Sequence, residues 1–374
     1  MTAPRFWAEE GSVYASYART HSAVESLLTP HLQYYAAAIN IATLLAMRAV
    51  PLEMAPLVTV SIAFALQLIP VAIVLFTRSS VWNGLAARAT LASLIVLSCT
   101  GEIWLTTLGA PFHLSLAAAL ILLVDTPDPS RCERRLLLCV LALASITGPC
   151  TVFLLPAFLL ASLSDGTPQR RTQTLVVCCG ALVQVLAFGW SLHTQGFPAD
   201  RFHRLGLAYL RRIYIDGAIA RPFIFQAFYE QFPRLNLVAA CAVGVVLLRG
   251  LVSTTTRVAV VAMISLSGLS LLTSLRMSGG ERYFLASGVL LYCVCLAGVP
   301  HIARPLARGP IGAIALALLT CAAIRSTTTF TSRMTPFFQS TWPVWRNEVG
   351  LWRASPSYQP HVHPPPTWTV DFGP

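Results

Sequence analysis

Apolar stretches alternate with short polar segments along this chain between residues 57 and 324. Each stretch is rich in Leu, Val, Ala and Ile and nearly free of charge, which is typical of helices that cross a lipid bilayer. Several stretches are shorter than the ~20 residues that a crossing needs, so their helices are expected to extend beyond the apolar run. The pattern predicts an all-α polytopic membrane protein with about ten transmembrane helices, at residues 57–76, 89–99, 112–124, 136–146, 152–163, 174–190, 237–248, 258–272, 284–299 and 311–324.

The two ends of the chain differ from this apolar middle. The stretch at residues 31–50 is apolar but carries Asn40 and Arg48, which favours a helix along the outer membrane surface over a spanning one. The C-terminal part is rich in tryptophan and proline, which predicts an irregular cap because proline interrupts helices. The expected division is an outer segment at 1–54, a transmembrane domain at 55–324 with an outer loop at 191–236, and an outer tail at 325–374.

Composition agrees with a membrane protein. The chain is 55% hydrophobic and 11% charged, whereas soluble domains carry about 25% charged residues. Its formal net charge is +11, and all of its 26 basic residues are arginine. We attribute this balance to orientation in the membrane and to attraction for lipid phosphate, and expect no nucleic-acid partner. The ten cysteines show no zinc-ligand spacing, and Walker, G-x-G-x-x-G and G-x-S-x-G motifs are absent from the sequence.

Arginines gather in alternate loops, and this predicts the topology. By the positive-inside rule these loops face the cytoplasm, and the others face the outer side of a bacterial inner membrane. The alternation requires that residues 31–50 do not cross. The arginines concerned are Arg78 and Arg88, then Arg131, Arg134 and Arg135, then Arg170 and Arg171, then Arg249 and Arg257, and finally Arg304 and Arg308.

The adjacent carboxylates Glu9 and Glu10 are the first candidates for chemistry. Neighbouring carboxylates repel, so one pKa tends to rise toward neutrality, and such a group is a usable general base. On a helix or turn the two side chains point to different sides. One is therefore expected to be catalytic, while the other caps the backbone or binds a metal. The alternative is a solvated acidic N-terminus.

Further candidates lie on the same predicted outer side. Glu102 precedes an apolar stretch that contains His113, and a carboxylate at the membrane boundary needs a partner unless it reaches the headgroups. Arg276 and Arg282–Tyr283 flank a Gly-Gly pair and could clamp a phosphate, or simply anchor the helix in the interface.

Two weaker signals complete the set. The 191–236 loop interleaves arginines, among them Arg211 and Arg212, with aromatic residues, which suits an anionic headgroup. The pair His361 and His363 is a weak candidate for a metal site.

Taken in order, these motifs resemble the GT-C superfamily, the multi-spanning glycosyltransferases that use polyprenyl-phosphate sugars. The relatives include protein mannosyltransferases, lipid A aminoarabinose transferases and, more closely, uncharacterised bacterial members. Residues 5–11 (RFWAEEG) are similar to an R-F-W-A-E-D-G-like stretch in the first outer loop of those proteins. The other similar features are R-A-V-P at 48–51, Glu102 with His113, T-G-P at 147–149, L-L-P at 154–156, and R-Y-F at 282–284.

The resemblance implies a mechanism in which a carboxylate of the first outer loop deprotonates the acceptor hydroxyl and the lipid phosphate leaves. Transferred to this chain, the base is Glu10, with Glu9 second. The donor is a polyprenyl-phosphate sugar in the bilayer, and the acceptor is an envelope glycan, lipid or protein. No cofactor is certain, and a divalent cation stays open. The implied substrate-binding residues are Arg5, Glu102, His113, Arg276, Arg282, Tyr283, Arg211 and Arg212.

The chain departs from that family in two ways. A membrane helix is expected before the acidic motif, but the sequence begins with the motif itself. Glu10 also stands where aspartate is usual, and an error on the order of 1 Å costs a base dearly. Two other functions stay open: a transporter or flippase for a lipid-linked sugar, and a non-catalytic subunit of an envelope assembly complex. A transporter would place ionisable residues inside the spans, so the nearly charge-free spans favour an enzyme.

Overall fold

The computed structural model describes residues 4–98, 103–126, 129–196, 207–225, 231–251, 253–273, 281–299, 309–338, 344–364 and 368–373. These residues form helices joined by turns, and the only β pairing among them is a few isolated bridges. The predicted all-α class is therefore confirmed.

The N-terminal segment folds into four short helices, the last of which is the helix expected within residues 31–50. These are η1 (Glu10–Ala15), α1 (Ser16–Thr20), α2 (Ala23–Leu28) and α3 (Ala37–Arg48). The helix α2 begins at a capping box, in which the Ser22 side chain accepts from the Glu25 amide and the Glu25 carboxylate accepts from the Ser22 amide. The 12 residues of α3 span about 18 Å, less than the ~30 Å hydrocarbon core.

The remaining helices form the body of the protein. In chain order they are η2 (Leu52–Met54), α4 (Ala55–Phe76), α5 (Leu85–Leu97), η4 (Thr107–Gly109), α6 (Ala110–Leu123), α7 (Arg131–Ser145), η5 (Pro149–Leu154), α8 (Leu155–Asp165), α9 (Pro168–Gln195), α10 (Leu207–Arg211), η7 (Arg212–Ala220), α12 (Pro233–Gly250), α13 (Thr254–Thr273), η8 (Glu281–Phe284), α14 (Leu285–Gly298), α15 (Pro310–Phe338) and α16 (Trp345–Ala354).

The helix α6 is the centre of the hydrophobic core. Every residue of α6 except Phe112 is buried, and the helix contacts α4, α7, α13 and α14. A helix that is apolar on all sides has no preferred face and is stable only when other helices surround it. The core therefore forms around α6.

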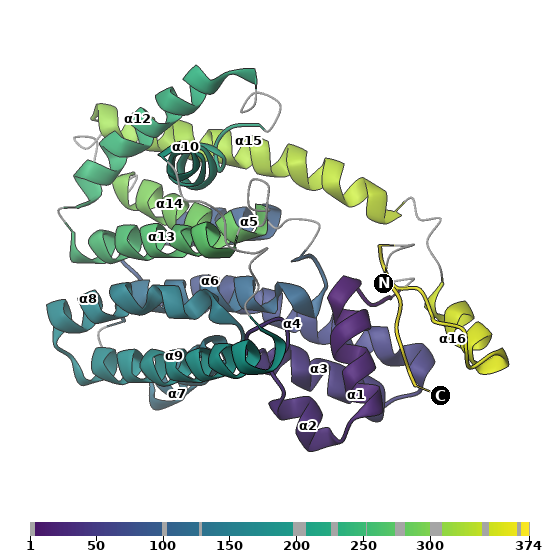
Figure 1. Cartoon of the computed structure of the whole chain (residues 1–374). Coiled ribbons are helices and arrows are strands. Elements are labelled where there is room, and N and C mark those ends of the chain that lie inside the picture. The colour runs from purple at the N-terminus through teal and green to yellow at the C-terminus, as the bar shows by residue number, and fades with distance from the viewer. Residues whose placement is uncertain are drawn as a thin grey trace.

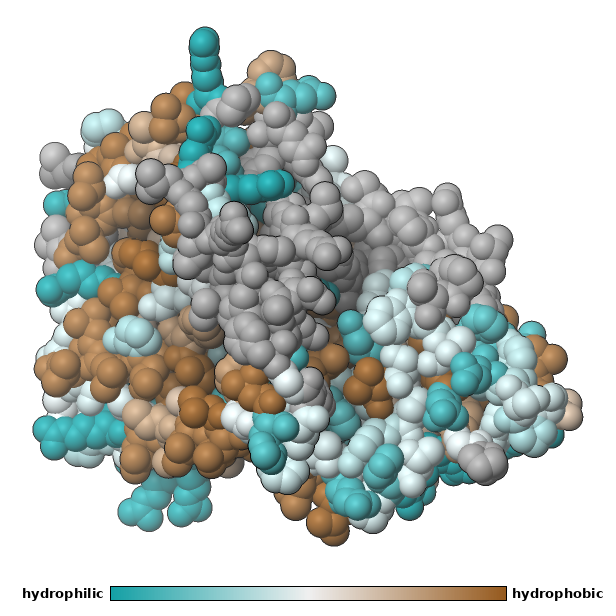
Figure 2. All heavy atoms as spheres, viewed as in Figure 1, coloured by the Kyte–Doolittle hydropathy of each residue, from teal (hydrophilic) through white to brown (hydrophobic). Residues whose placement is uncertain are grey.

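Three helices of the described residues are long and apolar enough to cross a membrane: Leu52–Phe76, Pro168–Thr194 and Pro310–Phe330. The other apolar helices are shorter, so the total of about ten spans stays a prediction. On α9, large apolar side chains such as Leu182, Leu186 and Trp190 are more than half exposed. Figure 2 shows hydrophobic residues gathered over the stacked helices on the left of the molecule. Such a surface is typical of contact with lipid.

The tail after residue 324 is more ordered than its prolines predict. The helix α15 continues through residue 338, across the expected boundary at 324/325, and α16 adds a further 10 residues. The prediction of an irregular cap was therefore wrong for this part. The helix α16 forms because residues 345–354 contain no proline, although several prolines flank them.

The N-terminal helices and α16 collect at one end of the helical body. In Figure 1 the helices α1, α2, α3 and α16 lie together at the right-hand end, beyond the stacked layers formed by α8, α9, α13 and α14. A separate small core joins them, in which Ala18 and Ala46 pack with Trp345 and Val349. Figure 2 shows mixed and hydrophilic residues over this end.

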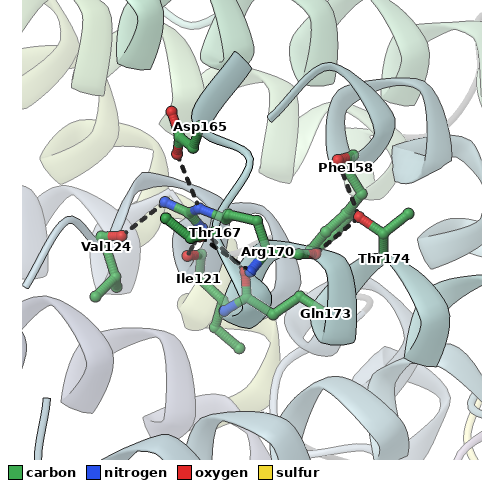
Figure 3. A network of polar contacts seen from close by, with 8 residues as sticks. All are labelled: Ile121, Val124, Phe158, Asp165, Thr167, Arg170, Gln173 and Thr174. Carbon is green, nitrogen blue, oxygen red and sulfur yellow. Dashed lines mark hydrogen bonds and ion pairs between the residues drawn. The ribbon is translucent and has the colours of Figure 1, made fainter. Parts of the chain in front are cut away.

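The opposite, C-terminal end of α6 is capped by Arg170, from the first turn of α9 (Figure 3). Its guanidinium donates to the carbonyls of Val124 at 2.8 Å and Ile121 at 3.3 Å, and it pairs with Asp165 at 3.3 Å. The last carbonyls of a helix lack partners within the helix and attract cations. Arg170 is one of the arginines that predict a cytoplasmic loop. The helix α6 thus has an arginine at its C-terminal end, opposite the end that begins after η4.

Candidate active site

The Glu10 carboxylate lies at the N-terminal end of the η4–α6 helix pair. It accepts from the Thr107 amide at 2.9 Å, from the Thr107 hydroxyl, and from the Trp7 amide at 3.1 Å. The side chain is only 1% exposed. Burial raises the pKa of Glu10 to about 6, although the three hydrogen bonds oppose that rise. A buried carboxylate with three donors fastens the N-terminal segment to the core.

The acidic motif is also held from its other side by the C-terminal strap, defined here as residues 360–364. The Ala8 amide donates to the His363 carbonyl at 2.5 Å, and the His363 amide donates to the Phe6 carbonyl at 3.1 Å. The Trp7 and His363 rings lie 4.5 Å apart. Gly11 packs so closely on Val362 that an added Cβ would lie 2.7 Å from it. Residues from both ends of the chain thus fix the motif.

Backbone strain marks the same place. Ala8 adopts a φ of +38°, in the left-handed region that non-glycine residues rarely occupy. Such a conformation costs on the order of 1–3 kcal/mol and persists only when surrounding contacts impose it. Here these contacts are the strap bond at the Ala8 amide and the bond from the Glu10 amide to the Trp7 carbonyl, at 2.7 Å. After this turn, Glu10 is buried and Glu9 is half-buried.

The strap is itself tied to α16 through Glu348. This carboxylate is 7% exposed and accepts from the Tyr358 hydroxyl at 2.6 Å and from the His361 amide at 2.8 Å. Burial, followed by the hydrogen bond to Glu348, raises the pKa of Tyr358 to about 12. The helix α16 is in turn anchored to η2, because the Trp345 indole donates to the Leu52 carbonyl at 2.8 Å. Of the two histidines that the sequence suggests as metal ligands, His361 belongs to this network, and His363 contacts Trp7.

Glu9 is half-buried and lies beside a group of tyrosines. Tyr14 is buried and packs with Tyr34 and with Leu108 of η4. Burial raises the pKa of Tyr34 to about 12, with smaller contributions from the charges of Tyr283 and Glu9. The Glu9 carboxylate thus acts electrostatically on both Tyr14 and Tyr34. Of the two acids, Glu9 is the less buried one.

The predicted phosphate-binding residues Arg282 and Tyr283 lie at the first turn of α6. The Tyr283 ring meets the Phe112 ring edge-on at 5.2 Å. The Arg282 guanidinium lies 6.0 Å from the centre of the Phe112 ring and 5.4 Å from that of Tyr283. Both distances are within cation–π range. The structure thus brings η8 to the helix end that also holds Glu10.

His113 follows Phe112 and is buried, with 1% exposure. It lies near the Ile103 carbonyl, which accepts from the Gln67 amide at 2.8 Å. Its predicted partner Glu102, like the predicted phosphate ligand Arg276, lies outside the described residues.

Arg5 stands beside the strap. It is half-buried, and this burial lowers the pKa of Arg5 to about 10. Burial first, and the Arg5 charge second, lower the pKa of His363 to about 4. At neutral pH the imidazole is therefore uncharged and Arg5 is a cation next to the Glu9 turn.

Arg211 and Arg212 are exposed at the junction of α10 and η7. Arg211 lines a pocket of about 420 Å³ together with residues of η7 and α12, and none of the Glu10, Tyr34 or Arg282 group lines that pocket. In Figure 1 the helix α10 lies at the top of the molecule, well separated from α1 and α3. The predicted site residues therefore fall into two places rather than one.

Sequence reasoning missed Thr107, Tyr34 and Phe112. Thr107 lies 97 positions from Glu10, and a threonine before an apolar stretch carries no signal of its own. The pair Tyr34–Tyr35 at the start of an interfacial helix is a signal that could have been used, because buried tyrosines at a membrane surface usually serve as hydrogen-bond partners. Within the described part of the chain, no group of three or more His, Cys, Asp or Glu side chains gathers as a metal site would require.

Comparisons with known proteins leave the site to be judged on its geometry. No family model matches this chain, and neither curated proteins nor solved structures give a match.

Proposed function

We propose that this protein is an integral membrane glycosyltransferase of the GT-C type, which transfers a sugar from a polyprenyl-phosphate donor to an envelope glycan, lipid or protein acceptor outside the membrane. One observation carries the proposal. Two carboxylates, an arginine and a group of tyrosines converge at the N-terminal end of α6, where an apolar helical body meets a polar cap. A lipid-linked substrate with a polar head requires a site at such a boundary.

Within this proposal Glu9 is the general base, and Glu10 positions it. Glu9 is half-buried, whereas Glu10 is 1% exposed and accepts three hydrogen bonds. A base must come within hydrogen-bond reach of the acceptor hydroxyl. This reverses the order that the family resemblance implies, in which Glu10 comes first. With Glu9 as the base, the glutamate at position 10 no longer has to match the family's aspartate, because the Glu10 carboxylate has a structural role.

These residues account for the proton and for the leaving group of the transfer. The acceptor oxygen attacks the anomeric carbon while its proton passes to the Glu9 carboxylate. The bond between the anomeric carbon and the phosphate oxygen breaks, and its electron pair leaves with the phosphate. Arg282 stabilises the charge that develops there, since a guanidinium neutralises phosphate oxygens. The aromatic rings of Phe112 and Tyr283 beside Arg282 fix its position.

The test is sugar transfer by the full chain in membranes supplied with a panel of polyprenyl-phosphate sugars. We expect Glu9→Gln to lower the transfer rate by about 10²–10⁴-fold, the usual contribution of a general base. The matched control is Glu25→Gln, which removes a carboxylate from the same segment at an exposed helix cap. Activity in Glu9→Gln equal to that of the control would disprove the role of Glu9. No transfer from any donor would contradict the glycosyltransferase itself.

One observation favours a second candidate, a transporter or flippase for a lipid-linked sugar. Arg325 lies within the candidate span Pro310–Phe330, is 7% exposed, and donates to the Ile224 carbonyl at 3.1 Å. Ionisable residues inside membrane helices often line substrate paths. Vesicles that carry the protein separate the two functions, because a flippase moves a labelled lipid-linked sugar between leaflets without an acceptor.

A further inference from the structure

A second polar site lies at η7 and is lined by none of the Glu10, Tyr34 or Arg282 group. It is a pocket of about 420 Å³ with walls from three helices: Arg211 of α10, Ile215 and Asp216 of η7, and Arg234 and Leu237 of α12. The Asn236 amide donates to Asp216 at 3.4 Å, which links η7 to α12. The pocket therefore forms where the continuous segment α10–η7 meets α12, which is separate from it in the sequence.

The charges of the pocket specify its ligand. Arg211 and Arg234 present two guanidinium groups, and Asp216 contributes one carboxylate, so the net charge of the walls is one positive unit. Guanidinium groups are the side chains best suited to phosphate oxygens. A net charge of +1 matches a phosphodiester, which carries one negative charge, and Asp216 offers an acceptor to a hydroxyl on the same headgroup.

The surface next to the pocket indicates that this phosphodiester belongs to a lipid. Leu237, a wall of the pocket, is 61% exposed, and Val238 and Leu248 farther along α12 are 64% and 71% exposed. The 18 residues of α12 span about 27 Å. Acyl chains extending from the pocket along α12 would cover this apolar surface.

We propose that this pocket binds the headgroup of an anionic phospholipid such as phosphatidylglycerol. The phosphate lies between Arg211 and Arg234, a headgroup hydroxyl donates to Asp216, and the acyl chains follow α12. The proposal depends on the membrane location of the chain but not on sugar transfer.

The bound lipid would stabilise the wall of the candidate active site. The next residue of η7, Gly217, packs on the Phe284 ring so closely that an added Cβ would lie 2.4 Å from it. Phe284 belongs to η8, which also carries Arg282. A lipid that fastens η7 to α12 thus holds η7 against the element that positions the arginine.

The experiment measures lipid binding by native mass spectrometry of the full chain, with phosphatidylglycerol, phosphatidylcholine and glycerophosphate as probes. We expect phosphatidylglycerol to bind the wild type preferentially, and the double variant Arg211→Gln/Arg234→Gln to bind it about tenfold or more weakly, since each hydrogen bond to a charged group is lost. Arg249→Gln is the matched control, because Arg249 is exposed near the other end of α12. Arg211→Lys/Arg234→Lys keeps both charges and is expected to retain preferential binding.

Three outcomes would overturn the lipid site: equal binding of phosphatidylglycerol and phosphatidylcholine, an equal loss in Arg249→Gln, or competition by glycerophosphate at matching concentration, which would indicate a soluble ligand. The Glu9→Gln variant separates this proposal from the proposed function. It is expected to lose sugar transfer while it binds phosphatidylglycerol like the wild type.

Discussion

Glu9 and Glu10 are adjacent in sequence but have opposite surroundings. Glu10 is buried against Thr107 and Trp7, while Glu9 is half-buried beside tyrosines. Consecutive side chains of a helical turn point in different directions, and only that of Glu10 reaches Thr107. From sequence, the pair predicted one catalytic and one capping carboxylate. Which acid has which task depends on contacts 97 residues away.

The burial of Glu10 predicts a pH dependence of stability. Its pKa in the folded protein is about 6, above the ordinary value of 4.5, because burial disfavours the charged form. The folded state therefore binds the proton more tightly than the unfolded state. The free energy of unfolding should fall by about 2 kcal/mol as the pH rises from 4.5 to 7.

The comparison of wild type with Glu10→Gln isolates this effect, since glutamine does not titrate. We expect thermal unfolding in detergent to lose this pH-dependent component in Glu10→Gln and to occur at a lower temperature at pH 7. The lower temperature follows because an amide cannot accept from all three donors. Identical pH profiles for the two proteins would contradict the assignment.

At the scale of elements, the C-terminal strap explains how a motif at the start of the chain is held in place. The strap pairs with Phe6 and Ala8, and Glu348 of α16 ties the strap down. The family resemblance implies a membrane helix before the motif as its support. In the structure, the described support comes from the strap on one side and from η4 on the other.

Removal of the Glu348 carboxylate is therefore expected to loosen the acidic motif. In Glu348→Ala, the Tyr358 hydroxyl and the His361 amide lose their acceptor, at a cost of about 1–3 kcal/mol. The Ala8 amide, which donates to the strap, should then exchange its hydrogen about tenfold or more faster. Hydrogen exchange of the peptide around residue 8 measures this, with Ser357→Ala as the control on the exposed part of the tail. Unchanged exchange would mean that the strap does not depend on Glu348.

The contact between η7 and η8 predicts an unusual sensitivity to one methyl group. A Cβ at Gly217 would lie 2.4 Å from the Phe284 ring, whereas a Cβ at Gly189 of α9 meets nothing within 4 Å. We expect Gly217→Ala to destabilise the protein by about 1–3 kcal/mol through overpacking. Gly189→Ala should stabilise it by about 0.5–1 kcal/mol, because alanine favours a helix. Denaturation midpoints measure both variants, and equal midpoints would rule out the close packing of η7 on η8.

At the scale of the whole molecule, α6 separates two chemically different ends. Arg170 caps its C-terminal end, and Glu10 binds just before its N-terminal end. The arginine-rich loops predict that the Arg170 end faces the cytoplasm. The candidate active site would then face outside, together with α16 and the strap.

This orientation is testable with a thiol reagent that does not cross the membrane. Cys132 at the start of α7 is exposed, and Ser355 just after α16 is exposed. In intact cells, with the other cysteines replaced by alanine, we expect labelling of Ser355→Cys but not of Cys132. After the membrane is opened, both should react. Labelling of Cys132 in intact cells would reverse the topology.

The sequence by itself determined the helical class, the apolar character of the body, and the residue types of the candidate site. These follow from composition and local periodicity, because each apolar stretch must be a helix if its backbone is to be satisfied in lipid. It also predicted Arg282 and Tyr283 as neighbours of the carboxylates, and the structure places both residues at the first turn of α6.

Only the tertiary structure decided which of the two acids is less buried, what holds the acidic motif, and how the arginines divide between two places. The Glu10–Thr107 bond, the pairing of strap and motif, and the Arg211 pocket each join residues far apart in the chain or on separate helices. No local pattern encodes such contacts, because their free energy arises from burial and hydrogen bonding once the helices have packed. The difference between a buried Glu10 and a half-buried Glu9 is a product of that packing.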